Sequence, residues 1–146
     1  SRFLVCEVLY REAGLGGESS GPASEGAVLA AVREALRANF GDGGLGRALG
    51  SLQVRLANPH TNLCVLRCSR DELRTVWAAL TLLTEVGGRP ALVRVAHVSG
   101  SSRLCRREAE TLLRSALSAR SAALSATKQL AQAERHLDEQ LARFEP

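Results

Sequence analysis

Residues 52–68 have the sequence LQVRLANPHTNLCVLRC, in which two short apolar stretches flank Asn58-Pro59-His60-Thr61. Each stretch is rich in residues that favour strands, and the four residues between them favour a turn. The pattern therefore predicts a β-hairpin with strands at 52–57 and 62–68. Alternation along the first strand is expected to place three apolar residues on one face: Leu52, Val54 and Leu56.

The segments around this hairpin extend the pattern in both directions. Residues 2–10 and 91–98 are apolar and rich in β-forming residues, and they are predicted to be strands. Apolar residues recur at helical spacing in 24–40 and 69–86, which are predicted to be helices. The order β-α-β-β-α-β indicates the α+β class. It predicts, over residues 1–100, the ferredoxin-like arrangement shared by RNA-recognition domains, a four-stranded antiparallel sheet with both helices on one face.

Two glycine-rich stretches interrupt this domain. Residues 14–24 are predicted to be a flexible loop, and Ser24 is placed to cap the helix that follows. Gly41 is expected to end that helix, because glycine readily takes the backbone conformation found at helix C-termini. Residues 41–50 contain five glycines and are predicted to be a second mobile connection.

Residues 101–146 differ in composition from the domain before them. From Ser101 to Glu145 there is no glycine or proline, which predicts one long helix, or two with a break within 115–127. An apolar stripe at helical spacing must pack on something, and its own domain is the expected surface. The stripe consists of Leu130, Leu137, Leu141 and Phe144. We therefore expect a C-terminal helical extension that packs on the first domain.

The other face of the predicted sheet is expected to be open. If Leu4, Cys6 and Val8 face the two helices, alternation turns Phe3 and Val5 outward. The strand at 62–68 has no aromatic residue, so base stacking on this face is not expected. Leu63 and Val65 would add to an apolar surface larger than a small monomer usually exposes. We therefore expect the isolated chain to need a protein partner for solubility.

Positive charge is concentrated in the middle of the chain. The net charge is +4, with +3 in 47–74 and +5 in 89–120, against −2 in 1–28. Eighteen arginines stand against one lysine. Arginine pairs bidentately with phosphate, so the distribution favours a polyanion ligand, although GC-rich codon usage also explains the excess of arginine over lysine. No apolar run approaches the ~18 residues of a membrane span, and the N-terminus does not resemble a signal peptide, so no membrane role is expected.

The cysteines predict neither a metal site nor a disulfide framework. Cys6, Cys64, Cys68 and Cys105 form no C-x-x-C pair, and the three histidines lack zinc-ligand spacing. Buried free thiols in a reducing compartment are the expected state. An enzyme with Cys105 as nucleophile and His97 as base is a competing interpretation. It lacks an orienting acid at a recognisable position, and no G-x-S-x-G motif occurs, so no catalytic or metal-binding residue is predicted.

Three motifs occur in register along the chain. They are VRLANPHTNLCVLRC (54–68), Val76-Trp77-x-Ala79-Leu80, and His97-Val98-x-Gly100-x-x-Arg103-x-Cys105. Together with the opening RFLVCEV (2–8), they resemble the Pop-five/Rpp-fourteen family of ribonuclease P and ribonuclease MRP subunits. The resemblance covers roughly residues 2–114. The glycine-rich stretches match nothing in that family, and the tail follows it only in being helical.

The resemblance implies a role in a ribonucleoprotein. Members of this family support the catalytic RNA that removes the 5′ leader of precursor tRNA, and the related particle that processes precursor ribosomal RNA. The protein would then be no enzyme by itself and bind no cofactor, because the RNA holds the magnesium ions. The implied partners are the ribonuclease P/MRP RNA, precursor tRNA indirectly, the barrel-shaped Rpp-thirty subunit and other protein subunits, in the nucleus and nucleolus. A protein–protein scaffold or an independent RNA-binding module of this fold is the alternative.

The strongest candidate site is the small-residue turn that leads into the C-terminal extension. Such a turn presents free backbone N–H groups and the positive end of the helix dipole to an anion. Ser101 or Ser102 would cap the helix. The resemblance favours an RNA phosphate here over an ordinary capped helix with a solvated basic turn. The predicted RNA-binding residues are Ser99, Gly100, Ser101, Ser102, Arg103, Arg106 and Arg107.

Five further residues have two interpretations each. Arg55, Arg67 and Arg94 are predicted on the outward sheet face, where they would meet either RNA or carboxylates of a partner. Strand alternation places His97 on the same face as Val93 and Val95, so a buried, hydrogen-bonded histidine is expected rather than an RNA contact. Trp77 is expected in the core rather than as a stacking platform.

Overall fold

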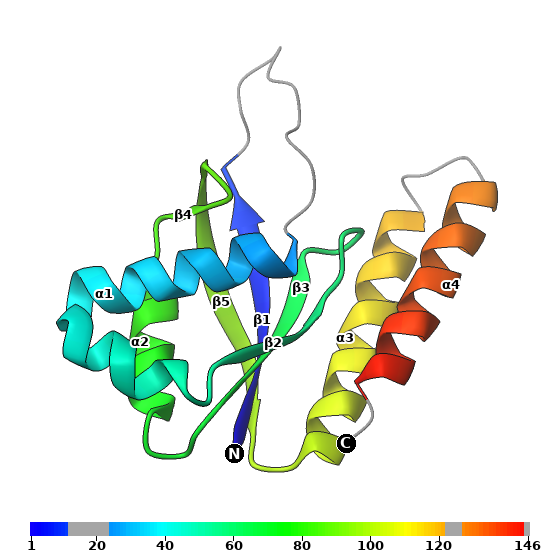
Figure 1. The fold of residues 1–146 in the computed structure, drawn as a ribbon. Coiled ribbons are helices and arrows are strands. Elements are labelled where there is room, and N and C mark those ends of the chain that lie inside the picture. The colour runs from blue at the N-terminus through cyan, green and yellow to red at the C-terminus, as the bar shows by residue number, and fades with distance from the viewer. Residues whose placement is uncertain (12–23, 122–126, 145–146) are drawn as a thin grey trace.

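The structure is a computed structural model that describes residues 1–11, 24–121 and 127–144, without the side chains of 120–130. Its elements (Figure 1) are β1 (Arg2–Tyr10), α1 (Glu25–Leu49), β2 (Gln53–Ala57), β3 (Leu63–Cys68), α2 (Leu73–Leu82), β4 (Glu85–Val86), β5 (Arg89–Ser99), α3 (Ser102–Ser121) and α4 (Thr127–Arg143). None of the described helices combines the length and apolar character that crossing a membrane requires. The predicted loop at 14–24 lies outside the described residues except for Ser24.

Five antiparallel strands form one sheet in the order β2-β3-β1-β5-β4. The predicted α+β class is confirmed, but the sheet has five strands where four were predicted. The added strand is β4, which pairs with the start of β5 across Gly87 and Gly88. Both glycines have positive φ angles, 61° and 77°, which suit a tight hairpin turn. This hairpin uses residues that were predicted as helix, and α2 therefore ends at Leu82.

The first core lies between the sheet and the helices α1 and α2 (Figure 1). Leu4, Cys6 and Val8 face this core, as strand alternation predicted. Fully buried apolar side chains meet them from α1 (Val32, Leu36) and from α2 (Val76, Leu80). Each such side chain stabilises the fold by roughly 1.5–3 kcal/mol relative to an exposed position.

Helix α1 is longer than predicted and is kinked. The Ser24 Oγ accepts a hydrogen bond from the Ala27 N–H at 3.1 Å, which confirms the predicted cap. Gly41, with φ 69° and ψ −177°, interrupts the helical backbone, but residues 42–49 resume it. The prediction of a mobile connection at 41–50 is therefore wrong. Leu45 and Ala48 pack on the first core, and this burial outweighs the weak helix propensity of the glycines.

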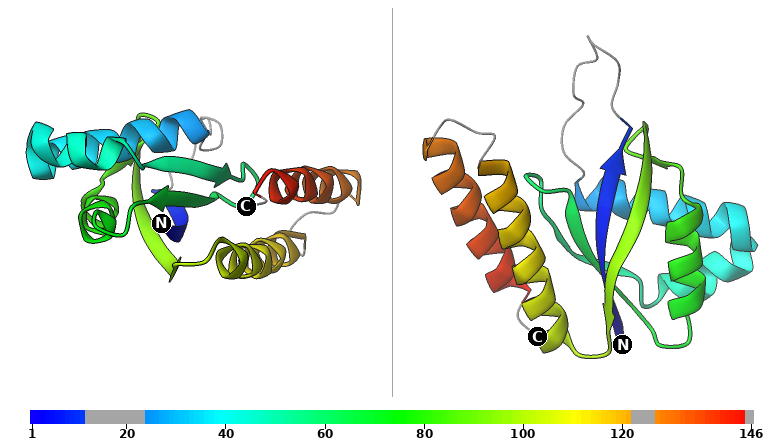
Figure 2. Two further views of the ribbon diagram at one scale, coloured as in Figure 1. Left: turned by 60° about the horizontal axis from the view of Figure 1, so that its bottom comes forward. Right: turned by 180° about the vertical axis from the view of Figure 1, so that it is seen from behind.

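The second sheet face is covered by α3 and α4, which form an antiparallel pair (Figures 1 and 2). Phe3, Val5, Leu63 and Val65 pack beneath them and are at most 8% exposed. The helices contribute Cys105, Ala109, Leu113, Leu117, Ala133, Leu137, Leu141 and Phe144 to this second core.

The predicted packing of the apolar stripe on its own domain is confirmed at three of its four positions, while the side chain of Leu130 lies outside the description. The expectation of an open apolar face is wrong, because this face and the stripe bury each other. The prediction that the isolated chain needs a protein partner for solubility rested on this exposed face, and the structure does not support that reason.

Two β-bulges change which side chains share a face. Between Val54 and Leu56 the register with β3 shifts, so Leu56 joins the second core while Val54 packs on the first. The predicted common face of Leu52, Val54 and Leu56 is thus wrong for Leu56. A second shift occurs in the pairing of β1 with β5, where Val5 pairs with His97 but Cys6 pairs with Val95. An extra residue in one strand reverses the alternation beyond it.

The hairpin turn at 58–62 is tied to α4 through Asn58, a buried polar residue that is 1% exposed. Its Oδ1 accepts hydrogen bonds from the His60 and Thr61 N–H groups at 2.9 and 3.1 Å. Its Nδ2 donates to the Gln140 Oε1 at 3.0 Å, and the Gln140 Nε2 donates to the Ala57 carbonyl at 2.5 Å. The C-terminal pair is therefore held to the sheet by polar as well as apolar contacts.

Candidate functional site

The predicted turn connects the end of β5 to the first turn of α3. The Ser99 Oγ accepts from the Ser101 N–H at 3.1 Å, and the Ser101 Oγ accepts from the Leu104 N–H at 3.4 Å. Ser101 is therefore the residue that caps α3, and Ser102 begins the helix. The backbone N–H groups of this first turn carry the positive end of the helix dipole. Such a helix start attracts an anion if cationic side chains surround it.

Two of the three arginines in the first turns of α3, Arg103 and Arg107, point away from the second core. Cys105 is fully buried in that core, while Arg103 and Arg107 are exposed and Arg106 is half-buried. Arg103 and Arg107 are four residues apart and so share one side of the helix. No described carboxylate pairs with either of these two guanidinium groups, so their charge is available to a ligand.

Two of the predicted sheet arginines lie at the same end of the molecule as this helix start. Arg55, Arg67 and Ser102 line one hollow of about 240 Å³, together with Ser1, Phe3 and Phe144. The Arg67 Nε and NH2 groups donate to the Ser1 Oγ at 3.1 and 2.8 Å, and no described carboxylate neutralises Arg55 or Arg67. The structure thus brings together cationic groups from β2 and β3 beside the first turn of α3.

Arg2 belongs to this region and was missed from the sequence. A Cβ atom on Gly100 would lie 3.0 Å from the Arg2 NH1 and 3.4 Å from its Cζ, so the guanidinium group rests against the backbone of the turn. The pairing of Phe3 with Ser99 is what places Arg2 there. The sequence could have indicated this contact only once the order of the strands was known. We name the set Arg2, Arg55, Arg67, Arg103, Arg106 and Arg107 the arginine edge.

Arg94 is not part of the arginine edge. It lies five residues before Ser99 on β5, about 16 Å along the strand. Its guanidinium group forms an ion pair with Glu7, the residue opposite it on β1. The three outward arginines that were predicted as a group are therefore divided, with Arg94 largely neutralised by its own sheet.

The structure places His97 and Cys105 on the same side of the sheet, but Cys105 does not have the properties of a nucleophile. The bulge at β5 places His97 opposite Val5, on the α3 side of the sheet, so the predicted common face with Val93 and Val95 is wrong. His97 is half-buried rather than buried. Burial, and then the charge of Glu108, raise the pKa of the Cys105 thiol to about 12, so the reactive thiolate is strongly disfavoured.

Trp77 was expected in the core and is instead 43% exposed. Helix α2 buries Val76, Ala79 and Leu80, which are spaced three and four residues apart. Trp77 lies about 100° around the helix from Val76 and so falls at the margin of that buried stripe. The prediction is wrong because helical spacing shows that a buried stripe exists but not how wide it is, and α2 buries only one narrow face.

These observations define a small, basic α+β protein in which six of the 18 arginines gather at one end of a sheet that has a core on each face. Among the described residues, no group of three or more His, Cys, Asp or Glu side chains is placed to hold a metal ion.

The family is established by comparison with known proteins. The model of the Rpp14/Pop5 family matches residues 2–110, and the chain belongs to that family.

Individual relatives agree with this assignment. A Schizosaccharomyces pombe protein named ribonuclease P/MRP protein subunit POP5 is 38% identical over 106 residues, which span 69% of this chain and 76% of that protein. An Arabidopsis thaliana protein named probable ribonuclease P/MRP protein subunit POP5 is 45% identical over 76 residues. That match spans 52% of this chain and 50% of the relative's length.

A solved structure has a similar fold. A chain in the cryo-EM structure of yeast ribonuclease MRP superimposes with a TM-score of 0.52 over 69% of this chain and 74% of that chain. The two sequences are 12% identical, so this likeness concerns the fold alone.

Proposed function

We propose that this chain is a non-catalytic, RNA-contacting protein subunit of the ribonuclease P and ribonuclease MRP ribonucleoproteins. In this role it supports the catalytic RNA in removing the 5′ leader of precursor tRNA and in processing precursor ribosomal RNA. The proposal includes a nuclear and nucleolar location and an Rpp-thirty-type barrel subunit as protein partner. It also treats the sheet as a ferredoxin-like sheet that β4 extends at one edge. The names of the similar proteins support the proposed membership of the ribonuclease P and MRP ribonucleoproteins. The arginine edge supports the proposed contact with RNA.

The observation that carries the RNA contact is the convergence at the arginine edge. Arg55 and Arg67 line one hollow with Ser102, while Arg2 rests on Gly100 of the adjoining turn. Some arginines elsewhere in the chain are paired internally, among them Arg94 with Glu7, Arg47 with Glu72, and Arg114 with Glu110 and Asp138. At the arginine edge, no described carboxylate forms an ion pair with Arg2, Arg55, Arg67, Arg103 or Arg107. Guanidinium groups so placed beside a helix start are suited to bind the phosphates of a nucleic acid backbone.

The proposal assigns the magnesium ions and the chemical step to the RNA. On the protein side, the buried Cys105 has a pKa of about 12 and lies on a helix whose first turns expose only arginines and Leu104. We therefore expect that the recombinant protein without RNA does not cleave precursor tRNA, with or without magnesium. Robust cleavage by RNA-free protein would contradict this part of the proposal.

RNA binding is tested by the salt dependence of affinity for ribonuclease P RNA. Each lost phosphate contact should reduce the slope of log affinity against log salt by roughly 0.7–0.9. The Arg103→Ala, Arg106→Ala, Arg107→Ala triple variant should therefore lose about 2–3 units of slope, and Arg55→Ala with Arg67→Ala about 1.5–2 units.

The matched control is Arg33→Ala with Arg37→Ala on α1, at exposed positions outside the arginine edge. This pair should change the slope by less than about 0.5. Equal losses in the control and in the edge variants would mean that binding is spread over the whole basic surface. The edge would then have no special role.

A further inference from the structure

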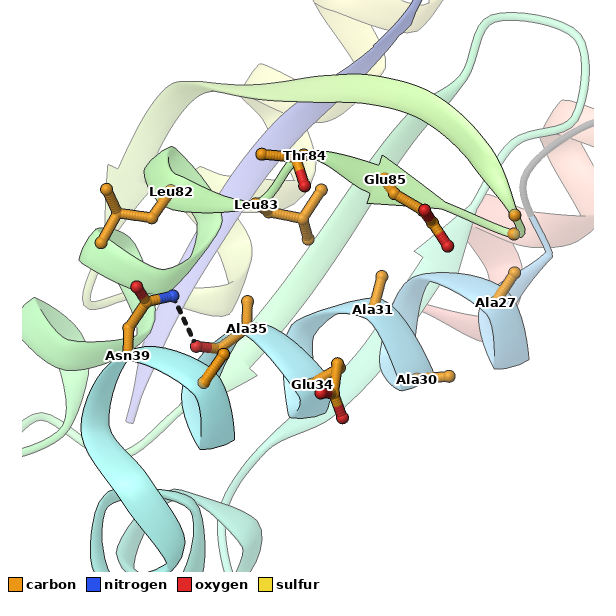
Figure 3. Close-up of a pocket in the computed structure, with 13 residues that line it drawn as sticks. Ala27, Ala30, Ala31, Glu34, Ala35, Asn39, Leu82, Leu83, Thr84 and Glu85 are labelled. Atoms are coloured by element: carbon orange, nitrogen blue, oxygen red, sulfur yellow. Dashed lines mark hydrogen bonds between the residues drawn. The ribbon is translucent and has the colours of Figure 1, made fainter.

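A groove lies between α1 and the segment that connects α2 to β5 (Figure 3). Its volume is about 460 Å³. The α1 wall consists mainly of alanines, and the opposite wall is formed by residues 82–85 with Gly87 and Gly88. Leu82 lines one end and is 53% exposed, so an apolar side chain is open to solvent here. The α1 alanines that line the groove are Ala27, Ala30, Ala31, Ala35 and Ala38.

Two carboxylates line the groove without a cationic partner. Glu34 comes from α1 and Glu85 from β4, and Figure 3 shows Glu85 extending from its strand toward α1. Neither forms an ion pair with a described basic residue, although the chain carries a net charge of +4. The arginine one turn beyond Glu34, Arg37, lies 3.8 Å from Asp42 instead. The groove is therefore an acidic, partly apolar site on a basic protein.

We propose that this groove docks an amphipathic helix of a protein partner that presents lysine or arginine beside small apolar residues. The five alanines of the α1 wall let another backbone approach closely, and the longer α1 side chains that line the groove are Glu34 and Asn39. The apolar ridge of such a helix would pack against Leu82 and the alanines, and its cationic side chains would reach Glu34 and Glu85.

The charge of the groove argues against a nucleic acid as its occupant. Glu34 and Glu85 repel phosphate, whereas the arginine edge attracts it. The two sites are therefore chemically distinct, and the chain can hold RNA at one while holding a basic protein segment at the other. This inference goes beyond the proposed RNA contact and does not depend on it.

The experiment uses the full chain and a synthetic helical peptide of about four turns as the probe, with leucine and alanine on one face and lysine on the other. Binding is followed by fluorescence anisotropy at low salt and by amide shifts in NMR spectra. The peptide should shift residues 27–39 and 82–88 and leave the first turns of α3 unchanged. A peptide with glutamate in place of lysine should not bind.

Two variants alter the groove, and each has a control variant on α4. Glu34→Lys with Glu85→Lys should weaken binding at least tenfold, and Ala30→Trp should do the same by filling the groove from an exposed position. The controls are Glu134→Lys and Ala142→Trp, exposed residues on α4, which should change affinity less than twofold. Circular dichroism confirms that each variant folds.

Several outcomes would overturn the proposal. They are equal binding of both peptides, shifts confined to α3 and α4, or no binding at millimolar peptide. If RNA instead shifted the amide signals of residues 27–39 and 82–88 in the same spectra, the groove would be a nucleic-acid site. Self-association of the chain that the Glu34→Lys, Glu85→Lys variant abolishes would assign the groove to a second copy. A failure of the arginine-edge variants to alter RNA binding would leave this result untouched.

Discussion

Leu137→Ala tests whether the C-terminal helices form one structure with the sheet. Leu137 is fully buried in the second core, where α4 covers β1 and β3. The substitution removes about three methylene-sized groups, which corresponds to about 2.4 kcal/mol of lost transfer free energy at ~0.8 kcal/mol each. The cavity left behind adds to this, so the free energy of unfolding should fall by about 3 kcal/mol. For a chain of this length the melting temperature should drop by about 6–12 °C.

The matched control is Leu104→Ala on α3, where the leucine is 53% exposed. Its effect on the free energy of unfolding should stay within about 0.5 kcal/mol. Urea unfolding followed by circular dichroism measures both variants, and hydrogen exchange shows whether α3 and α4 open separately from the sheet. Equal effects of the two substitutions, or a Leu137→Ala loss below about 1 kcal/mol, would refute the packing of α4 described above.

Three further predictions concern single residues. Because the pKa of Cys105 is raised to about 12 in the folded state, the unfolded chain releases its thiol proton first as the pH rises above the ordinary value of 9.0. Stability should therefore fall between pH 9 and 12, by up to about 1.4 kcal/mol per pH unit for this thiol, and urea titrations of Cys105→Ala should show a shallower fall. Gly41→Ala should cost about 1 kcal/mol or more, since the φ of 69° disfavours a residue with a Cβ atom; an unchanged urea midpoint would show that the kink is not required. Gly100→Ala should push the Arg2 guanidinium group from the turn and weaken RNA binding about as much as Arg2→Ala, with no further loss in the double variant; additive losses would show that the two residues act independently.

Much of the fold followed from local patterns in the sequence. Strand alternation placed Leu4 and Cys6 opposite to Phe3 and Val5, and the capping role of Ser24 followed from its place before a helical pattern. These features depend on neighbours within a few residues. The spacing of apolar residues along the chain and the residue types are therefore sufficient to predict them. The family motifs likewise lie in continuous segments, and the family match agrees with them.

The predictions that failed depend on contacts between distant segments. Residues 42–49 are helical despite their glycines because Leu45 and Ala48 find a core to pack on. Each bulge becomes visible only when two strands are paired, and one of them moved His97 to the opposite face.

The candidate site shows the same division. The sequence by itself determined the family, the α+β class, the capped start of α3 and its three arginines. Only the tertiary structure brought Arg2, Arg55 and Arg67 to that helix start and paired Arg94 with Glu7 instead. The physical reason is that a side chain's charge is a property of the residue, whereas its neutralisation or availability depends on which segments the sheet order places beside it.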